Sequence, residues 1–183
     1  MTPPLFVAIA MPLEIATRLE ATCGGVPGAR WVPAENMHVT LRYLGELDGT
    51  LADDVCAVLT EIEAERFELA IAGVNRFGNR KDSHVLFTGL APREPLKRLR
   101  DKIEIGLQRL GVKADERKYH PHVTLARLHR AQPDRVGRFL EANGLMTSQP
   151  FGVESFSLYE SIRGSDGAVY REIERYGLRE RAG

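Results

Sequence analysis

The order of apolar and polar residues along the chain predicts a mixture of strands and helices. Short apolar or alternating runs indicate strands, and apolar residues spaced three to four positions apart indicate helices. The predicted strands are 5–10, 37–44, 67–74, 84–90, 122–128, 151–161 and 168–176, and the predicted helices are 12–23, 51–66, 95–110 and 133–142. Because hairpins interrupt the strand-helix alternation of a doubly wound parallel sheet, we expect an α+β protein with antiparallel sheets.

Two of the predicted strands contain the same four residues. The segments 38–41 and 122–125 both have the sequence His-Val-Thr-Leu, and a chain with only five histidines is not expected to repeat such a motif by chance. In each half of the chain a motif strand is followed by a helix and a hairpin. This order is consistent with two similar halves, although the halves share little sequence outside the motifs.

The motifs combine two side chains that suit acid-base chemistry on a phosphate. Side chains alternate along a strand, so His38 and Thr40 share one face, and His122 and Thr124 share the equivalent face. If the halves pack about an approximate twofold axis, all four side chains would line one cleft. A histidine pKa near 6.5 allows one ring to accept a proton while the other donates one, and threonine hydroxyls can donate hydrogen bonds to phosphate oxygens. This scheme needs no metal or other cofactor.

Composition narrows the class of protein. The 25 basic and 25 acidic residues balance, which argues against a protein that coats long nucleic acids. If RNA is the substrate, we expect the protein to bind an end of it. Cys23 and Cys56 are too few for a disulfide framework, so we expect both to be reduced. The chain has no signal-peptide pattern and no apolar run long enough to span a membrane. We therefore expect a cytoplasmic monomer that needs no protein partner.

The segments around both motifs resemble a known family. They are RWV (30–32), ENMHVTLRYLGE (35–46), KYHPHVTLAR (118–127) and LYES (158–161), so they extend over nearly the whole chain. They resemble the two-histidine phosphoesterase superfamily, in particular the RNA 2′,3′-cyclic phosphodiesterases once called 2′-5′ RNA ligases. The resemblance implies one domain, residues 1–183, with two pseudo-symmetric lobes. Each lobe would hold one antiparallel sheet beside a central cleft, with the helices outside.

The resemblance also implies a reaction and a role for each motif residue. The reaction is hydrolysis of an RNA 2′,3′-cyclic phosphate end to a 2′-phosphate, with weak reverse 2′-5′ ligation. His38 would donate a proton to the leaving 3′ oxygen, and His122 would activate water. Thr40 and Thr124 would hold the phosphate, and Arg127 would add positive charge. Strict alternation places Arg127 on the opposite face from His122, so its role requires a bulge or a strand end.

Other interpretations of the same residues stay open at this point. Arg42 shares strand parity with His38, which predicts a contact with RNA at the cleft mouth, but a solvated arginine fits equally well. His38, His120 and His122 together resemble a three-histidine metal site, although no carboxylate or cysteine accompanies them. The aromatic residues Tyr43, Trp31 and Phe77 are more typical of core packing than of base stacking.

Two rival functions also stay open. One is a phosphodiesterase that acts on 2′-5′ oligoadenylates or small cyclic nucleotides. The other is a non-catalytic module that binds RNA ends.

Overall fold

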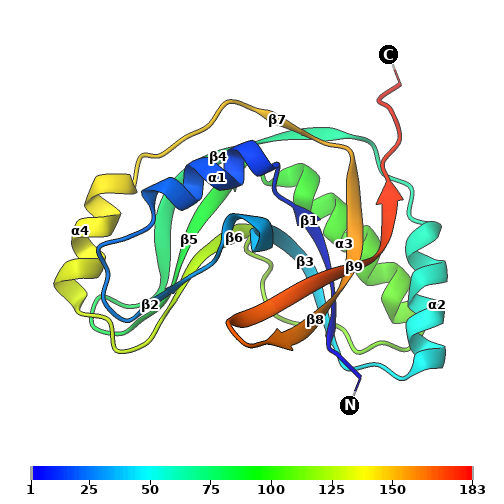
Figure 1. The fold of residues 1–183 in the computed structure, drawn as a ribbon. Helices are drawn as coiled ribbons and strands as arrows, with labels where there is room; N and C mark the ends of the chain where they lie inside the picture. Colours follow the sequence, from blue (N-terminus) through cyan, green and yellow to red (C-terminus); the bar gives the residue numbers. More distant parts are fainter. Residues whose placement is uncertain (1, 183) are drawn as a thin grey trace.

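The computed structural model describes residues 2–182 and has an antiparallel sheet that curls into a half-barrel with helices around its outside (Figure 1). The strands are β1 (Leu5–Ala10), β2 (Ala29–Trp31), β3 (His38–Gly45), β4 (Phe67–Gly78), β5 (Ser83–Ala91), β6 (His122–Leu128), β7 (Phe151–Val153), β8 (Ser155–Gly164) and β9 (Gly167–Gly177). The helices are α1 (Leu13–Thr22), α2 (Gly49–Thr60), α3 (Glu94–Arg109), α4 (Pro133–Asn143) and the short 3-10 helix η1 (Ala34–Asn36). The prediction of an α+β fold with antiparallel pairing is confirmed. No helix of residues 2–182 is long and apolar enough to span a bilayer.

The predicted pair of separate sheets is replaced by one continuous sheet. Its strand order is β7-β4-β5-β6-β3-β1-β8-β9, and β2 pairs with β6 outside this path. The four strands on either side of the centre meet where β3 pairs with β6, at the single residue pair Val39 and Val123. The expectation of two sheets was wrong because the two motif strands pair with each other directly across the centre of the molecule.

The two faces of the sheet differ in chemistry around this junction. Val39, Leu41, Val123 and Leu125 are each at most 2% exposed and belong to the hydrophobic core. The intervening His38, Thr40, His122 and Thr124 are half-buried on the other side, which we call the histidine face. Alternation along each strand therefore gives one apolar face and one face available for chemistry.

Helix α3 shows how the apolar face is covered. Leu96, Leu99, Ile103 and Leu107 recur at helical spacing and are each at most 2% exposed. Burying each of these side chains contributes about 1.5–3 kcal/mol to folding. The helix packs against β3 and α2, so it holds the first motif strand from its apolar side.

Three elements differ from the predicted ones, and the first is the strand expected over 151–161, which is divided at Glu154 into β7 and β8. The segment around Trp31 lies outside the predicted strands but forms β2, because its backbone pairs with β6. The helix expected to reach residue 66 ends at Thr60. After this helix the Arg66 N–H donates to the Arg179 carbonyl, and the Arg179 N–H donates to the Ala64 carbonyl. Pairing with the distant C-terminal segment thus outweighs the local helical pattern.

Candidate active site

The pairing of β3 with β6 brings the four motif side chains together. Val39 lies opposite Val123 in an antiparallel pair, so His38 lies opposite Thr124 and Thr40 lies opposite His122. The two histidines are therefore diagonal neighbours on the histidine face, with backbones about 7–8 Å apart. A phosphate placed over the junction would meet an imidazole and a hydroxyl from each strand.

Both imidazoles are oriented by the same backbone hydrogen bond. His38 Nδ1 lies 2.7 Å from the Asn36 carbonyl oxygen, and His122 Nδ1 lies 2.6 Å from the His120 carbonyl oxygen. A carbonyl can only accept, so Nδ1 carries a hydrogen in each ring. Nε2 is then the nitrogen that gains and loses a proton in both histidines. In His38 it lies 3.1 Å from the Thr40 hydroxyl.

Aromatic rings surround each imidazole. The His38 ring centre lies 5.0 Å from that of Phe6 and 5.2 Å from that of Tyr170. The His122 ring centre lies 4.9 Å from that of Phe77, which meets it edge to face. These contacts keep water from the sides of both imidazoles while Nδ1 stays bonded to the backbone.

The same surroundings lower the pKa of both histidines. Burial is the largest cause in each case, and the carbonyl bonded to Nδ1 opposes it. The charge of His122 further lowers the pKa of His38, and the charge of His120 lowers that of His122. Arg127 lowers the pKa of both rings. The two imidazoles therefore favour the neutral form, and a proton on one opposes a proton on the other.

A bulge follows each motif threonine. In β3, Thr40 pairs with Ala8 and Arg42 with Val7, which leaves Leu41 without a partner. In β6, Leu125 is skipped in the same way between Thr124 and Ala126. An extra residue reverses the alternation of side chains beyond it. Residues four and five positions after each histidine therefore lie on the faces opposite to those that strict alternation predicts.

The bulge in β6 places Arg127 on the histidine face. Arg127 pairs with Val85, two residues from Phe87, whose ring contacts His122. Its guanidinium is close enough to lower the pKa of both motif histidines. The bulge required for Arg127 to approach the site is thus present.

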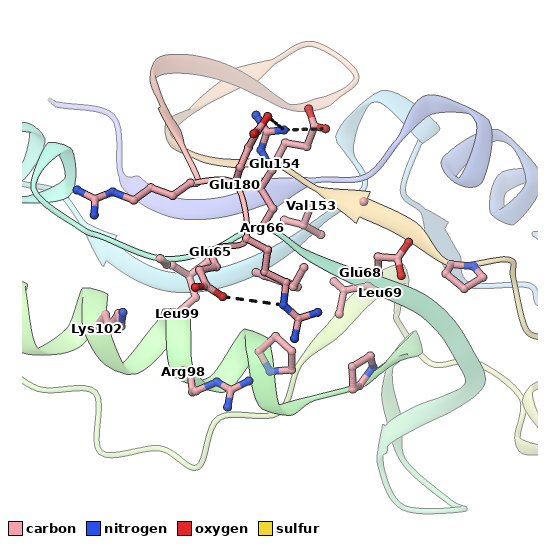
Figure 2. A pocket seen from close by; sticks show the side chains of 18 of the residues that line it. Glu65, Arg66, Glu68, Leu69, Arg98, Leu99, Lys102, Val153, Glu154 and Glu180 are labelled. Carbon is pink, nitrogen blue, oxygen red and sulfur yellow. Dashed lines mark ion pairs between the residues drawn. The ribbon is translucent and has the colours of Figure 1, made fainter. Parts of the chain in front are cut away.

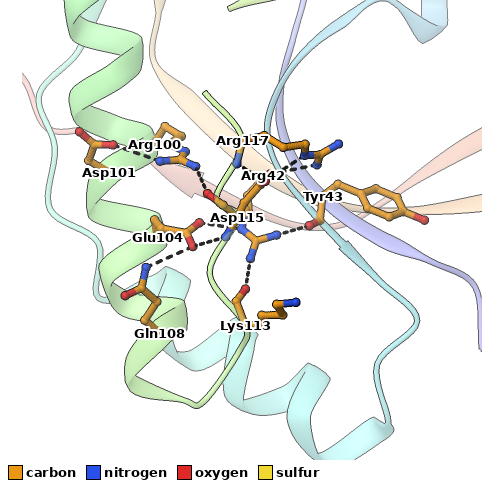
Figure 3. Close-up of polar contacts among 9 residues, drawn as sticks. All are labelled: Arg42, Tyr43, Arg100, Asp101, Glu104, Gln108, Lys113, Asp115 and Arg117. Atoms are coloured by element: carbon orange, nitrogen blue, oxygen red, sulfur yellow. Dashed lines mark hydrogen bonds and ion pairs between the residues drawn. The ribbon is translucent and has the colours of Figure 1, made fainter. Parts of the chain in front are cut away.

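The bulge in β3 has the opposite effect on Arg42, and the predicted contact with RNA was wrong. Arg42 is 8% exposed and lies on the apolar face, where its Nε donates to Glu104 at 2.6 Å (Figure 3). It also donates to the backbone carbonyls of Tyr43 and Lys113. Arg42 therefore binds α3 and the loop that follows it, away from the motif histidines.

Several neighbours of the motif histidines were not predicted from the sequence. Tyr43 was expected to pack in the core, but it is 50% exposed and pairs with Phe6 on the histidine face. Phe6 and Tyr170 come from strands far from the motif in the sequence. The alternation of side chains along the predicted strand 5–10 was the only sequence signal for the position of Phe6. No sequence signal indicated Tyr170. Trp31 does pack as expected, against Phe139 of α4.

His120 does not complete a metal site with the motif histidines. Among residues 2–182, no group of three or more histidine, cysteine or acidic side chains is arranged to hold a metal ion. The His120 ring centre lies 6.3 Å from that of His122, and His120 Nδ1 is buried without a hydrogen-bond partner. The His120 carbonyl instead orients His122.

A separate groove lies between the start of β4, α3, β7 and the C-terminal segment (Figure 2). It contains none of the motif residues. Its charges partly cancel, since Arg66 pairs with Glu154 and Glu180 at 3.6 Å. Arg98 of α3 also lines it, and this position provides a control distant from the histidine face.

The fold and the repeated motif define a class of proteins with two histidines on adjoining strands, and comparison with known proteins places the chain in one family of it. Residues 11–164 match the 2′-5′ RNA ligase superfamily. The chain belongs to this superfamily.

Relatives in the superfamily share both sequence and fold with this chain. An RNA 2′,3′-cyclic phosphodiesterase of Aeropyrum pernix is 32% identical over 152 residues, which cover 81% of this chain and 85% of the relative. The crystal structure of TT0787 of Thermus thermophilus matches with a TM-score of 0.80 and 25% identity, covering 98% of this chain and all of that one. Escherichia coli LigT complexed with 3′-AMP has the same fold, with a TM-score of 0.77, 24% identity and coverage of 97% and 99%. At the level of the family, the chain is related to phosphodiesterases.

Proposed function

We propose that the protein hydrolyses RNA 2′,3′-cyclic phosphate ends to 2′-phosphates by metal-independent acid-base catalysis. The observation that carries the proposal is the junction of β3 and β6, where His38 faces Thr124 and Thr40 faces His122. Such a set can position a phosphate and move protons at two of its oxygens without covalent chemistry on the protein. Relatives named as RNA 2′,3′-cyclic phosphodiesterases support the choice of substrate.

The proposed reaction uses the two Nε2 atoms in opposite ways. Neutral His122 accepts a proton from water as the water oxygen bonds to phosphorus. Protonated His38 donates its Nε2 proton to the 3′ oxygen as the bond between phosphorus and that oxygen breaks. The products are a 2′-phosphate and a free 3′ hydroxyl. This assignment of acid and base follows the family resemblance, because the hydrogen bonds of the two rings to the backbone are alike.

Threonines and arginine stabilise charge in this scheme. Thr40 and Thr124 donate hydrogen bonds to the non-bridging phosphate oxygens, which gain negative charge in the transition state. Arg127, on the histidine face, adds a positive charge to the site that favours the approach of an anionic substrate. Because acid-base catalysis runs in both directions, the same site supports weak 2′-5′ ligation.

The decisive experiment is a substrate panel assayed in EDTA. The panel contains an RNA oligonucleotide with a 2′,3′-cyclic phosphate, a 2′-5′ oligoadenylate and a 3′,5′-cyclic nucleotide. We expect turnover of the first, with the phosphate retained on the 2′ oxygen as read by mass spectrometry and by resistance to a 3′-specific phosphatase. A 3′-phosphate product, preference for another member of the panel or loss of activity on chelation contradicts the proposal. Binding of the cyclic end without turnover supports a non-catalytic module.

A further inference from the structure

Two arginines face each other where β2 joins β6. Arg30 and Arg127 are direct partners in this antiparallel pair, so their side chains lie on the same face, and both residues are exposed. Among the described residues 2–182, neither one forms an ion pair with a carboxylate. Two adjacent positive charges are therefore left without a counter-charge from the protein.

This arrangement is unfavourable in the free protein. Like charges directly across two strands destabilise a sheet. Two other arginines of the same sheet have acidic partners, since Arg175 has Glu172 at 3.0 Å and Arg171 has Glu160. Arg30 and Arg127 are distinctive because they lie directly opposite each other and neither has an acid beside it in the part of the chain that the structure describes. A bound anion would remove the repulsion, and guanidinium groups match the geometry of a phosphate.

The pair lies at a suitable distance from the junction of the motif strands. Because the bulge skips Leu125, Arg127 lies only two pairing positions from Thr124, which is about 7 Å along the strand. Arg30 is one strand further to the side, about 4.8 Å away. A strand whose terminal phosphate lies between His38 and His122 would place its next phosphate in this region, one nucleotide away.

We propose that Arg30 and Arg127 together bind the phosphodiester on the 5′ side of the terminal nucleotide. This inference rests on the proposed hydrolysis of cyclic phosphate ends and names a part of the substrate that the motif residues do not contact. It makes the preferred substrate an RNA end of at least two nucleotides. A mononucleoside 2′,3′-cyclic phosphate lacks the phosphodiester that this pair would hold.

The test compares a dinucleotide and a mononucleotide that both end in a 2′,3′-cyclic phosphate. For the wild type, we expect a higher kcat/KM on the dinucleotide. In Arg30→Ala the ratio of the two kcat/KM values should fall about tenfold or more, mostly through KM, since hydrogen bonds to charged groups are strong. Replacing the internal phosphodiester with an uncharged methylphosphonate should lower the ratio of the wild type by a similar factor. The control variant Arg98→Ala should keep the wild-type ratio.

The outcomes separate this inference from the proposed function. If the wild type hydrolyses neither substrate, the function itself fails. If it hydrolyses both but the ratio of the two kcat/KM values is unchanged in Arg30→Ala, the second phosphate site is overturned. This holds whether or not both values fall. Folding is monitored by thermal unfolding, and Arg30→Ala should be at least as stable as the wild type because a repulsion is removed. Should it unfold instead, Arg30→Lys and the methylphosphonate substrate decide the question.

Discussion

The two motif strands are alike up to their bulges and different beyond them. In both β3 and β6 a histidine is oriented by a backbone carbonyl, and a leucine is skipped in the pairing after the threonine. Beyond the bulge, β3 turns Arg42 into the protein and Tyr43 onto the histidine face. In β6 the equivalent positions are Ala126, which is buried, and Arg127, which is exposed on the histidine face.

Because of this difference, both motif strands supply an acid-base group to the site, but they do not both supply a positive charge. The repeated tetrapeptide supplies two equivalent imidazoles, and nothing in their backbone contacts distinguishes an acid from a base. Of the two motif strands, only β6 places an arginine on the histidine face, because Arg42 of β3 is neutralised by Glu104 in the interior. Positive charge on one side of the site suits a substrate that is itself asymmetric. The end of an RNA strand is asymmetric in this way, because the chain continues on only one side of the terminal nucleotide.

The largest expected effect comes from removing one imidazole at a time. His38→Ala and His122→Ala should each lower kcat on a cyclic phosphate by about 10² to 10⁴, the usual contribution of one proton transfer. The two variants should separate on a substrate with sulfur in place of the leaving 3′ oxygen. A thiolate leaves without a proton, so we expect this substrate to restore much of the activity of His38→Ala and little of that of His122→Ala.

The control for this comparison is the folded state of each variant. Both side chains are half-buried on the open face, so the unfolding transition followed by circular dichroism should stay cooperative. Equal restoration of both variants by the sulfur substrate would reverse our view that the two rings have different roles. A single variant with full activity would contradict the mechanism altogether.

The next effect concerns the arginine of the first strand, which should act on stability. Arg42→Ala leaves Glu104 as a buried charge without its partner, and breaking such a pair costs about 3–5 kcal/mol in the free energy of unfolding. Urea denaturation measures this loss. The double variant Arg42→Leu with Glu104→Leu should recover much of it, because no unpaired charge remains. A single variant as stable as the wild type would show that the interior pair contributes little.

The pH dependence of this stability follows from Glu104. Burial alone would raise the pKa of its carboxyl, but hydrogen bonds from the Asp115 amide, Arg42 and Gln108 bring the pKa below its ordinary value. A carboxyl with a lowered pKa in the fold stabilises it above the ordinary glutamate pKa of about 4.3 and loses this effect as the pH falls. The difference between the wild type and Arg42→Ala should therefore shrink on acidification.

The smallest expected effect is a shift of the pH-rate profile by the arginine of the second strand. Arg127 lowers the pKa of both histidines, so Arg127→Gln should move both limbs of a bell-shaped profile of kcat/KM to higher pH. The rate at the optimum should fall about tenfold with the lost charge. Arg127→Lys keeps the charge and should keep the position of the profile. An unmoved profile in Arg127→Gln would show that this charge does not act on the histidines.

The sequence was sufficient to predict the motif strands and their alternation. His38 and His122 lie in strongly apolar segments, and the buried valine and leucine between the polar residues make the period of two clear. The placement of Arg42 and Arg127 could not be predicted in the same way. It depends on bulges at Leu41 and Leu125, and a leucine in a strand gives no local sign that it will be left unpaired.

Contacts between distant segments were also beyond the sequence pattern. The union of the two predicted sheets depends on one residue pair whose partners are 84 positions apart in the sequence (123 − 39). Strand β2 has only three residues, and its pairing with β6 makes it a strand. The direct opposition of Arg30 and Arg127 therefore depends on the pairing of β2 with β6, which the sequence pattern does not predict.

The backbone bond at Nδ1 has one more consequence for the proposed reaction. Because Nδ1 stays bonded to the backbone throughout, each imidazole can gain or lose a proton only at Nε2. One turnover leaves His38 without its mobile proton and His122 with an extra one. Both must then exchange with the surroundings through the same nitrogen that faced the substrate. The product must therefore leave, or water must reach its place, before the protein is ready for another turnover.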